Sequence, residues 1–171
     1  MEQHVVLVNE QDEILGTMEK QQAHVYGLLH RAFSVFLFND QGQMLLQQRA
    51  EDKYHSPTQW TNACCSHPRL DETYLEAAHR RLQEELNLDT ELTHLFSFKY
   101  KADVGQDLWE HELDHVFHGI YNDPIQGNPE EVMATRWISM QDLEAEIKEQ
   151  PENFTPWFRI ILDQYQKHLP A

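Results

Sequence analysis

Cysteine is nearly absent from this sequence, and its two cysteines, Cys64 and Cys65, are neighbours. Two adjacent cysteines cannot join distant segments of the chain, and a disulfide between them would be strained. Both are therefore expected to be free thiols, which is typical of proteins in a reducing compartment. We expect a cytoplasmic protein.

Long hydrophobic runs are also lacking. No stretch of about 18 apolar residues occurs, so no transmembrane helix is expected. Residues 1–10 hold only a short apolar run between polar residues and no small-residue cleavage site, so no signal peptide is expected.

Positive charge is scarce: 13 Lys and Arg residues face 29 Asp and Glu residues, which gives a formal net charge of −16. Such a protein repels nucleic acid and anionic membranes, so neither is expected as a partner. An anionic substrate would need a local cationic site or a metal ion. The composition implies no obligate protein partner.

Glycine and proline are few, and 40% of the 171 residues are hydrophobic, a globular composition. A chain of this length fits one domain with one core, so residues 1–171 are expected to form a single domain. Hydrophobic patterns and turn residues predict strands over residues 4–8, 14–18, 32–38, 44–49, 95–101 and 113–121, and a short strand that includes 137 and 138.

Three helices are expected. Thr73 and Glu76 form a capping-box pair at the start of a helix that ends near Leu86, with apolar residues at helical spacing between them. A charged helix should follow Ser139, and Thr155 should cap a C-terminal helix whose buried stripe runs to Leu169. The order of strands, helix, strands and two helices predicts an α+β fold built as a mixed α/β/α sandwich.

The segment 61–68 carries a thiol close to an imidazole. On an extended segment residues i and i+2 face the same side, so Cys65 and His67 can share a site while Cys64 points away. This pair could serve as a metal site, a nucleophile or an acid. It could equally be a small buried cysteine beside a capping histidine.

Glu110 and Glu112 share one face at the start of an apolar strand. Two such carboxylates repel each other unless a cation lies between them, although a solvated strand entrance would also tolerate them. If they converge with His24, His30 and His67, the donor set suits Mn, Fe, Zn or Mg.

The helix around residues 80–88 resembles the Nudix box. Glu72, Arg80, Glu84 and Glu85 fit that pattern, whereas Ser66 and Asn87 replace its glycines and Arg81 replaces a glutamate. Nudix hydrolases gather carboxylates to hold the ions that activate water, and Arg81 reverses a charge among them. The fold resemblance survives this change, and hydrolysis becomes doubtful. A surface helix with salt bridges would show much of the same pattern.

Taken together, the chain resembles the type I isopentenyl diphosphate isomerases, which are non-hydrolytic members of the Nudix superfamily. The segments that carry the resemblance are 30–39, 45–49, 61–68, 80–86, 110–112 and 155–157. It implies a Nudix-like fold and an enzyme that interconverts isopentenyl diphosphate and dimethylallyl diphosphate in isoprenoid biosynthesis. The reaction protonates an alkene and deprotonates a carbocation.

The resemblance also implies roles for single residues. The expected ligands of one divalent metal, Mn²⁺, Zn²⁺ or Mg²⁺, are His24, His30, His67, Glu110 and Glu112. The expected proton-transfer pair is Cys65 and Glu112, with Tyr100 at the reacting end and Trp157 over the hydrocarbon. Glu85 and the backbone of Cys65 should hold a second Mg²⁺ that arrives with the substrate diphosphate. The residues expected around that diphosphate are Lys20, Arg49, Lys53, Arg80 and Arg81.

Two other functions remain open from the residues. One is a Nudix pyrophosphohydrolase, against which Arg81 and the Cys65/His67 motif speak. The other is a metal-binding scaffold with an inactive Nudix fold, against which the joint presence of Cys65, Glu112, Tyr100 and Trp157 speaks.

Overall fold

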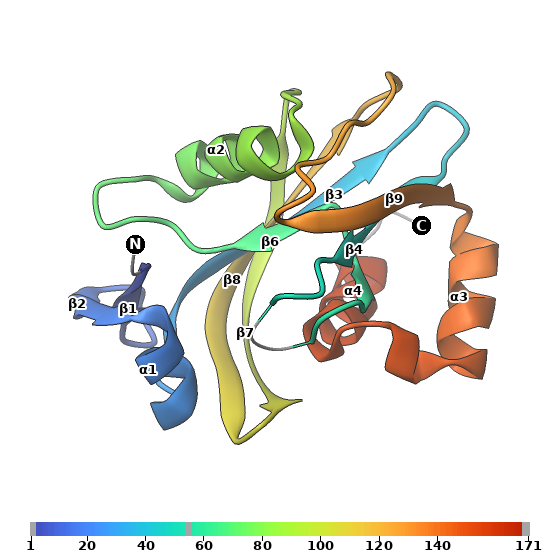
Figure 1. Cartoon of the computed structure of the whole chain (residues 1–171). Helices are drawn as coiled ribbons and strands as arrows, with labels where there is room; N and C mark the ends of the chain where they lie inside the picture. The colour runs from blue at the N-terminus through green and yellow to red at the C-terminus, as the bar shows by residue number, and fades with distance from the viewer. Residues whose placement is uncertain (1–2, 54–55, 169–171) are drawn as a thin grey trace.

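The computed structural model describes residues 3–53 and 56–168. Its described part contains a nine-stranded mixed sheet with helices packed against it (Figure 1). The strands are β1 (His4–Val8), β2 (Ile14–Glu19), β3 (His30–Phe38), β4 (Met44–Arg49), β5 (Trp60–Thr61), β6 (Cys64–Ser66), β7 (Thr93–Gly105), β8 (Leu108–Ile120) and β9 (Val132–Ile138). The helices are α1 (Lys20–Tyr26), α2 (Tyr74–Leu86), α3 (Met140–Glu149), α4 (Pro156–His168) and the short 3-10 helix η1 (Pro151–Asn153).

Strand β3 is the centre of the sheet. One edge of β3 pairs along its whole length with β8 in parallel. The other edge is divided among three antiparallel partners: β1 at its start, β6 in its middle and β4 at its end. This division brings the short strand β6 beside the centre of the sheet, where it carries residues of the candidate site.

Two cores lie on opposite faces of the sheet. Phe33, Val35 and Leu37 of β3 alternate toward α2 and pack with its apolar stripe, which includes Leu82. Phe36 of β3 points the other way and packs with α4. Figure 1 shows α2 separated by the sheet from α4. The α+β class and the sandwich arrangement are confirmed.

Helix α2 begins and ends as its sequence predicts. The Thr73 hydroxyl accepts from the Glu76 amide at 3.1 Å, and the Glu76 carboxylate accepts from the Thr73 amide at 2.9 Å. Asn87 ends the helix in the left-handed conformation with φ 53°, which Asn tolerates better than most residues. Thr155 likewise accepts from the Phe158 amide at the start of α4. Leu169 lies outside the described residues.

Several elements differ from the sequence-based expectation, and α1, β7 and β8 differ most. Helix α1 was not predicted, because seven residues with little apolar periodicity give a weak helical pattern. Strands β7 and β8 are longer than predicted and form one hairpin whose turn residues, Gln106 and Asp107, have φ 56° and 60°. Tight hairpin turns of this kind usually carry glycine or asparagine. Because Gln106 and Asp107 are neither, the sequence did not indicate a turn here.

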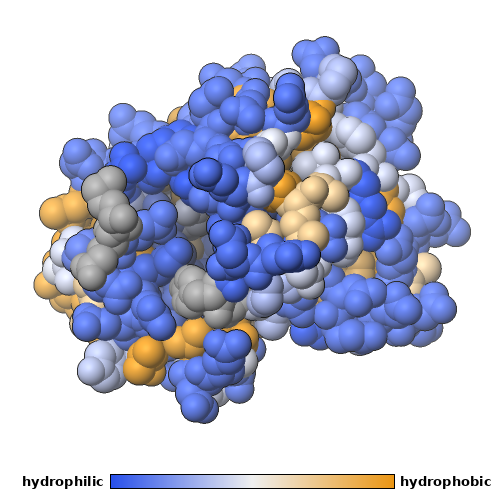
Figure 2. All heavy atoms as spheres, in the orientation of Figure 1, coloured by the Kyte–Doolittle hydropathy of each residue, from blue (hydrophilic) through white to orange (hydrophobic). Residues whose placement is uncertain are grey.

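The surface in view matches the composition. Figure 2 shows a face on which hydrophilic residues predominate, with smaller hydrophobic areas between them. In the described part of the chain, no helix is both long and apolar enough to cross a membrane.

Gly119 on β8 provides a test of the packing. A Cβ atom there would lie 2.7 Å from the backbone oxygen of Glu91, which cannot move without shifting the chain. We predict that Gly119→Ala lowers the free energy of unfolding by about 1–3 kcal/mol in urea denaturation, the usual effect of overpacking. Gly127→Ala is the control, because its new Cβ would approach the Val132 side chain no closer than 3.4 Å. Equal stability of the two variants would contradict this packing.

Candidate active site

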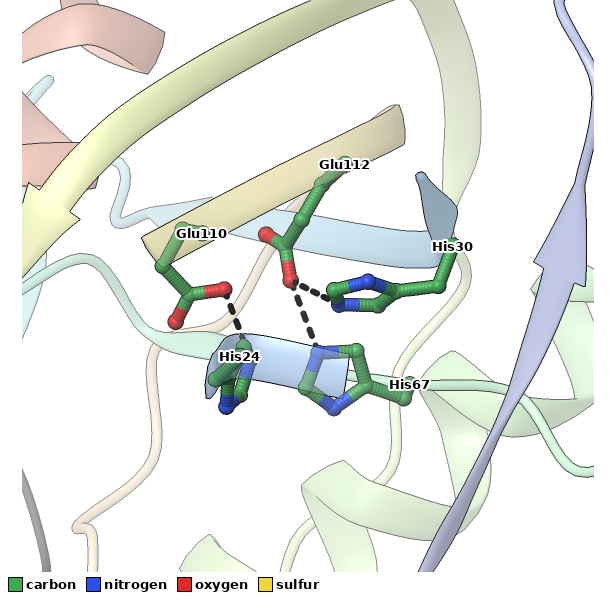
Figure 3. A group of neighbouring side chains, drawn as sticks. All are labelled: His24, His30, His67, Glu110 and Glu112. Carbon is green, nitrogen blue, oxygen red and sulfur yellow. Dashed lines mark hydrogen bonds and ion pairs between the residues drawn. The ribbon is translucent and has the colours of Figure 1, made fainter. Parts of the chain in front are cut away.

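Three histidines and two glutamates converge at one end of the sheet (Figure 3). One ligand atom of each residue lies within 4.8 Å of those of all the others. The five residues are His24, His30, His67, Glu110 and Glu112. Four of them are buried and His67 is partly buried. The structure therefore brings together the whole set that the sequence indicated as metal ligands.

The sheet register accounts for this convergence. His30, the first residue of β3, stands directly beside Glu112 of β8, and Glu110 lies two residues earlier on the same face. His67 follows β6, whose pairing with β3 aims it at the same region. His24 comes from α1, which packs against β8.

The Glu112 carboxylate contacts three other side chains of the site. Its Oε2 atom lies 3.1 Å from His30 Nε2 and 2.7 Å from His67 Nε2, and Tyr100 donates its hydroxyl proton to Oε1. Burial would raise the pKa of Glu112, but the hydrogen bond and charge of His30, together with Tyr100, lower it to about 2. Glu112 is therefore a carboxylate.

The hydrogen bonds of His30 favour a cation at this point. Its Nδ1 lies 2.8 Å from the carbonyl oxygen of Leu28, which can only accept, so Nδ1 carries the proton. In a neutral ring, Nε2 then turns a lone pair toward the Glu112 carboxylate. Either an imidazolium proton or a metal ion must lie between them, and a backbone carbonyl behind the ring is typical of metal-binding histidines.

The five residues fit a divalent metal ion. Imidazole and carboxylate donors suit Mn, Fe and Zn, and two buried carboxylates supply negative charge for any divalent cation. His24 Nε2 and Glu110 Oε2 stand 3.1 Å apart, a separation that two ligands of one ion can take. Burial and the neighbouring His30 depress the pKa of His67 well below its ordinary value, so its ring is neutral and can coordinate.

Cys65 and Cys64 face opposite sides, as predicted. The Cys65 side chain lines the cavity beside the His/Glu group, whereas Cys64 is fully buried and its thiol lies 2.6 Å from Glu85 Oε2. Burial and the charge of Asp114 raise the pKa of the Cys65 thiol, so Cys65 carries a proton.

Asn62 is a site residue that the sequence reasoning missed. The Cys65 thiol donates to Asn62 Oδ1 at 3.0 Å and also lies 3.4 Å from the Ser34 hydroxyl. The Asn62 amide nitrogen donates to the carbonyls of Val35 and Cys64 at 2.8 and 3.1 Å, so only its oxygen can face the thiol. Asn62 and Ser34 thereby hold the Cys65 side chain in one orientation.

Four cationic side chains line the same cavity: Lys20, Arg49, Lys53 and Arg81. Burial, followed by repulsion from Lys53 and Arg49, lowers the pKa of Lys20 to about 8. Arg80, which the sequence also indicated, lies elsewhere. It pairs with Glu72 and Glu84 and lines the neighbouring cavity instead.

Two more predicted residues border this cavity. Trp157 at the start of α4 is buried beneath Arg49, whose guanidinium lies 5.0 Å from the centre of the indole ring. Glu85 lines the cavity on the α2 side, and its Oε1 atom lies 3.5 Å from Arg81. Glu131, just before β9, was not predicted, although its side chain contacts Lys53 and Arg81.

Comparisons with known proteins identify the family to which the chain belongs. The NUDIX domain family model matches residues 28–158. The isopentenyl-diphosphate Delta-isomerase of Serratia proteamaculans is 48% identical over 162 residues, 95% of this chain and 90% of the relative. The protein of the same name from Pectobacterium atrosepticum is 49% identical over 156 residues, 91% of this chain and 87% of the relative.

Solved structures show the same fold. The crystal structure of DR0079 from Deinococcus radiodurans has a TM-score of 0.73 at 25% identity, covering 86% of this chain and 90% of that one. The MutT protein of Methanosarcina mazei has a TM-score of 0.67 at 16% identity, covering 81% and 94% of the two chains.

The His/Glu group leads to a binding prediction. We expect about one tightly held Mn²⁺ ion per chain and a loss of affinity of more than about tenfold in His67→Ala, because even residues that only support a ligand contribute about 10–100-fold. His115→Ala is the control, since His115 pairs with His94 and stacks on Tyr74 away from the group. Metal content after dialysis is the measurement, and equal Mn²⁺ retention in both variants would rule out this site.

Proposed function

We propose, because the chain belongs to the isopentenyl-diphosphate Delta-isomerases of the NUDIX family, that it interconverts isopentenyl diphosphate and dimethylallyl diphosphate in isoprenoid biosynthesis. The reaction moves a carbon–carbon double bond by protonation and deprotonation. The observation that carries the proposal is the single cavity that Cys65, Glu112 and four cationic side chains share.

Cys65 and Glu112 form the proton-transfer pair. Adding a proton to the alkene creates a tertiary carbocation, and removing a proton from another carbon completes the shift. The Cys65 thiol and the Glu112 carboxylate both line the cavity from different strands, β6 and β8. Tyr100 holds one oxygen of Glu112 through its hydroxyl, and so fixes the direction in which that carboxylate faces the substrate.

Water must be excluded, because it would trap the carbocation. Tyr100 and Trp157 are both buried, and they belong to the hydrophobic core that α4 closes. The indole face of Trp157 can stabilise the cation by roughly 0.5–2 kcal/mol. Because Arg49 lies against the same ring, the hydrocarbon and the diphosphate of one substrate can be bound side by side.

The residues that would hold the metal ions are those already described. His24, His30, His67, Glu110 and Glu112 would bind one Mn²⁺, Zn²⁺ or Mg²⁺, and Glu85 with the backbone of Cys65 would hold a Mg²⁺ that enters with the diphosphate. These ions supply positive charge that neutralises the diphosphate and sets the proton affinity of the site. Lys20, Arg49, Lys53 and Arg81 would contact the diphosphate oxygens, whereas Arg80 lines the neighbouring cavity.

The predictions about partners and location rest mainly on the composition of the chain. The partner is a small molecule, and the charge of −16 speaks against nucleic acid and anionic membranes. The cytoplasmic location, the single domain over residues 1–171 and the lack of an obligate protein partner stay predictions.

Arg81 separates this proposal from diphosphate hydrolysis. Its guanidinium contacts Glu84, Glu85 and Glu131, and so occupies with positive charge the region where hydrolases of this fold gather carboxylates. A metal-binding scaffold would not need the partly buried Cys65 thiol, which donates to Asn62 beside the metal ligands.

Proton NMR tests the reaction directly. Isopentenyl diphosphate incubated with the protein, Mg²⁺ and Mn²⁺ in D₂O should give dimethylallyl diphosphate with deuterium in its methyl groups and no free phosphate. Release of phosphate or pyrophosphate would indicate a hydrolase, and an unchanged spectrum with metal-loaded protein would indicate a scaffold.

The same assay tests whether the Cys65 thiol takes part in proton transfer. Cys65→Ala should lose at least about 10²–10⁴-fold in turnover, the usual contribution of a proton-transfer group, with fold and metal content unchanged. Cys64→Ser is the matched control, because its hydroxyl can still donate to Glu85, and it should stay within about tenfold of the natural protein. Equal losses in the two variants would exclude a special role for Cys65.

Lys20 predicts a pH dependence. Its pKa of about 8 in the free protein means that it loses its positive charge as the pH rises through this value, and diphosphate binding weakens. We expect kcat/KM to fall above about pH 8, since this parameter reports groups of the free enzyme. Lys20→Arg stays charged and should move this fall to higher pH. An unchanged profile in that variant would show that another group causes the fall.

A further inference from the structure

Glu131 is an anion placed among the cations of the candidate diphosphate site. Its Oε2 atom lies 2.6 Å from Lys53 Nζ and 3.0 Å from Arg81 Nη2, so one carboxylate oxygen pairs with two of the four cations that line the cavity. Burial would raise the pKa of Glu131, but Lys53 and Arg81 hold it below its ordinary value. Glu131 is thus a carboxylate that faces the place where phosphate oxygens must bind.

Glu131 and Glu85 approach the same guanidinium. Arg81 Nη2 lies 3.0 Å from Glu131 and 3.5 Å from Glu85, and both glutamates line the cavity. A bare diphosphate that enters must compete with Glu131 for Lys53 and Arg81, and must then lie near two carboxylates. A diphosphate that carries Mg²⁺ brings a cation toward those carboxylates, so the repulsion is turned into attraction.

We propose that Glu131 is a specificity-determining residue that makes this site select a Mg²⁺-bound diphosphate over a metal-free one. The inference rests on the proposed function only in placing a diphosphate among Lys20, Arg49, Lys53 and Arg81. Glu131 competes with a free anion for Lys53 and Arg81. Glu131 and Glu85 together place two carboxylates beside Arg81, toward which a magnesium ion on the diphosphate would be attracted.

A purely structural role is the alternative, because Glu131 ties the segment after β4 to the start of β9. That connection does not depend on the side chain alone. The amide of Ala50 donates to the backbone oxygen of Glu131 at 3.2 Å, and the amide of Glu131 donates to the Asn128 carbonyl at 2.9 Å. Replacing the carboxylate by an amide leaves both backbone bonds in place and removes only the charge.

Calorimetric titration with inorganic pyrophosphate tests the inference on metal-loaded protein, without added Mg²⁺ and then with Mg²⁺ in excess. Glu131→Gln should bind metal-free pyrophosphate about tenfold tighter than the natural protein, since one adjacent negative charge is removed. The gain in affinity on adding Mg²⁺ should shrink by a similar factor. Glu130→Gln is the matched control, because Glu130 is an exposed neighbour whose substitution changes the net charge equally.

Three results would overturn the inference. The first is unchanged binding in Glu131→Gln under both conditions. The second is an equal shift in Glu130→Gln, which would show an effect of net charge. The third is weaker binding in Glu131→Gln under both conditions with a lower melting temperature, the mark of a structural role. If the natural protein isomerises its substrate and the Mg²⁺ effect is unchanged in Glu131→Gln, only this inference fails. If it does not isomerise and the effect shrinks, only the proposed function fails.

Discussion

The burial of Glu110 and Glu112 on one face of β8 is the constraint on which the site depends. Two carboxylates two residues apart repel each other and lose hydration, so positive charge or hydrogen-bond donors must surround them. The chain supplies these from separate elements: His24 from α1, His30 from β3, His67 after β6 and Tyr100 from β7. A metal ion at their centre would satisfy both carboxylates at once, so binding the ion would also stabilise the arrangement of these elements.

The topology of β3 explains why the Cys65 thiol lies beside that group. Because β8 takes one edge of β3 and three short partners share the other, β6 reaches the centre of the sheet. The register then places Cys65 opposite Ser34, four residues along β3 from His30. Asn62 completes the arrangement, since its amide is tied to two backbone carbonyls and its oxygen is left for the thiol. Backbone pairing therefore sets the position of Cys65, and the side chains of Asn62 and Ser34 orient its thiol.

The parts of the site that the sequence predicted are those with local periodicity. Alternation along a strand was enough to place Cys65 with His67 and Glu110 with Glu112, and the capping pair of Thr73 and Glu76 was enough to start α2. The residues alone raised His24 only as a conditional candidate, and the family resemblance gave it the role of a metal ligand, because its helix has too little periodicity to be predicted. Asn62 and Glu131 escaped notice because their roles depend on contacts with Val35, Lys53 and Arg81, which are distant in sequence.

The charges in the cavity show how an acidic protein can bind an anionic substrate. Its four cations would repel one another if left unpaired, and the lowered pKa of Lys20 records that repulsion together with burial. The ion pairs of Lys53 and Arg81 with Glu131 reduce this repulsion among the cations when no diphosphate is bound. In our proposal the same pairing weakens the attraction of Lys53 and Arg81 for a free anion, and an ion that enters with the substrate adds affinity. A net charge of −16 therefore does not oppose diphosphate binding, provided that the substrate arrives with its own magnesium.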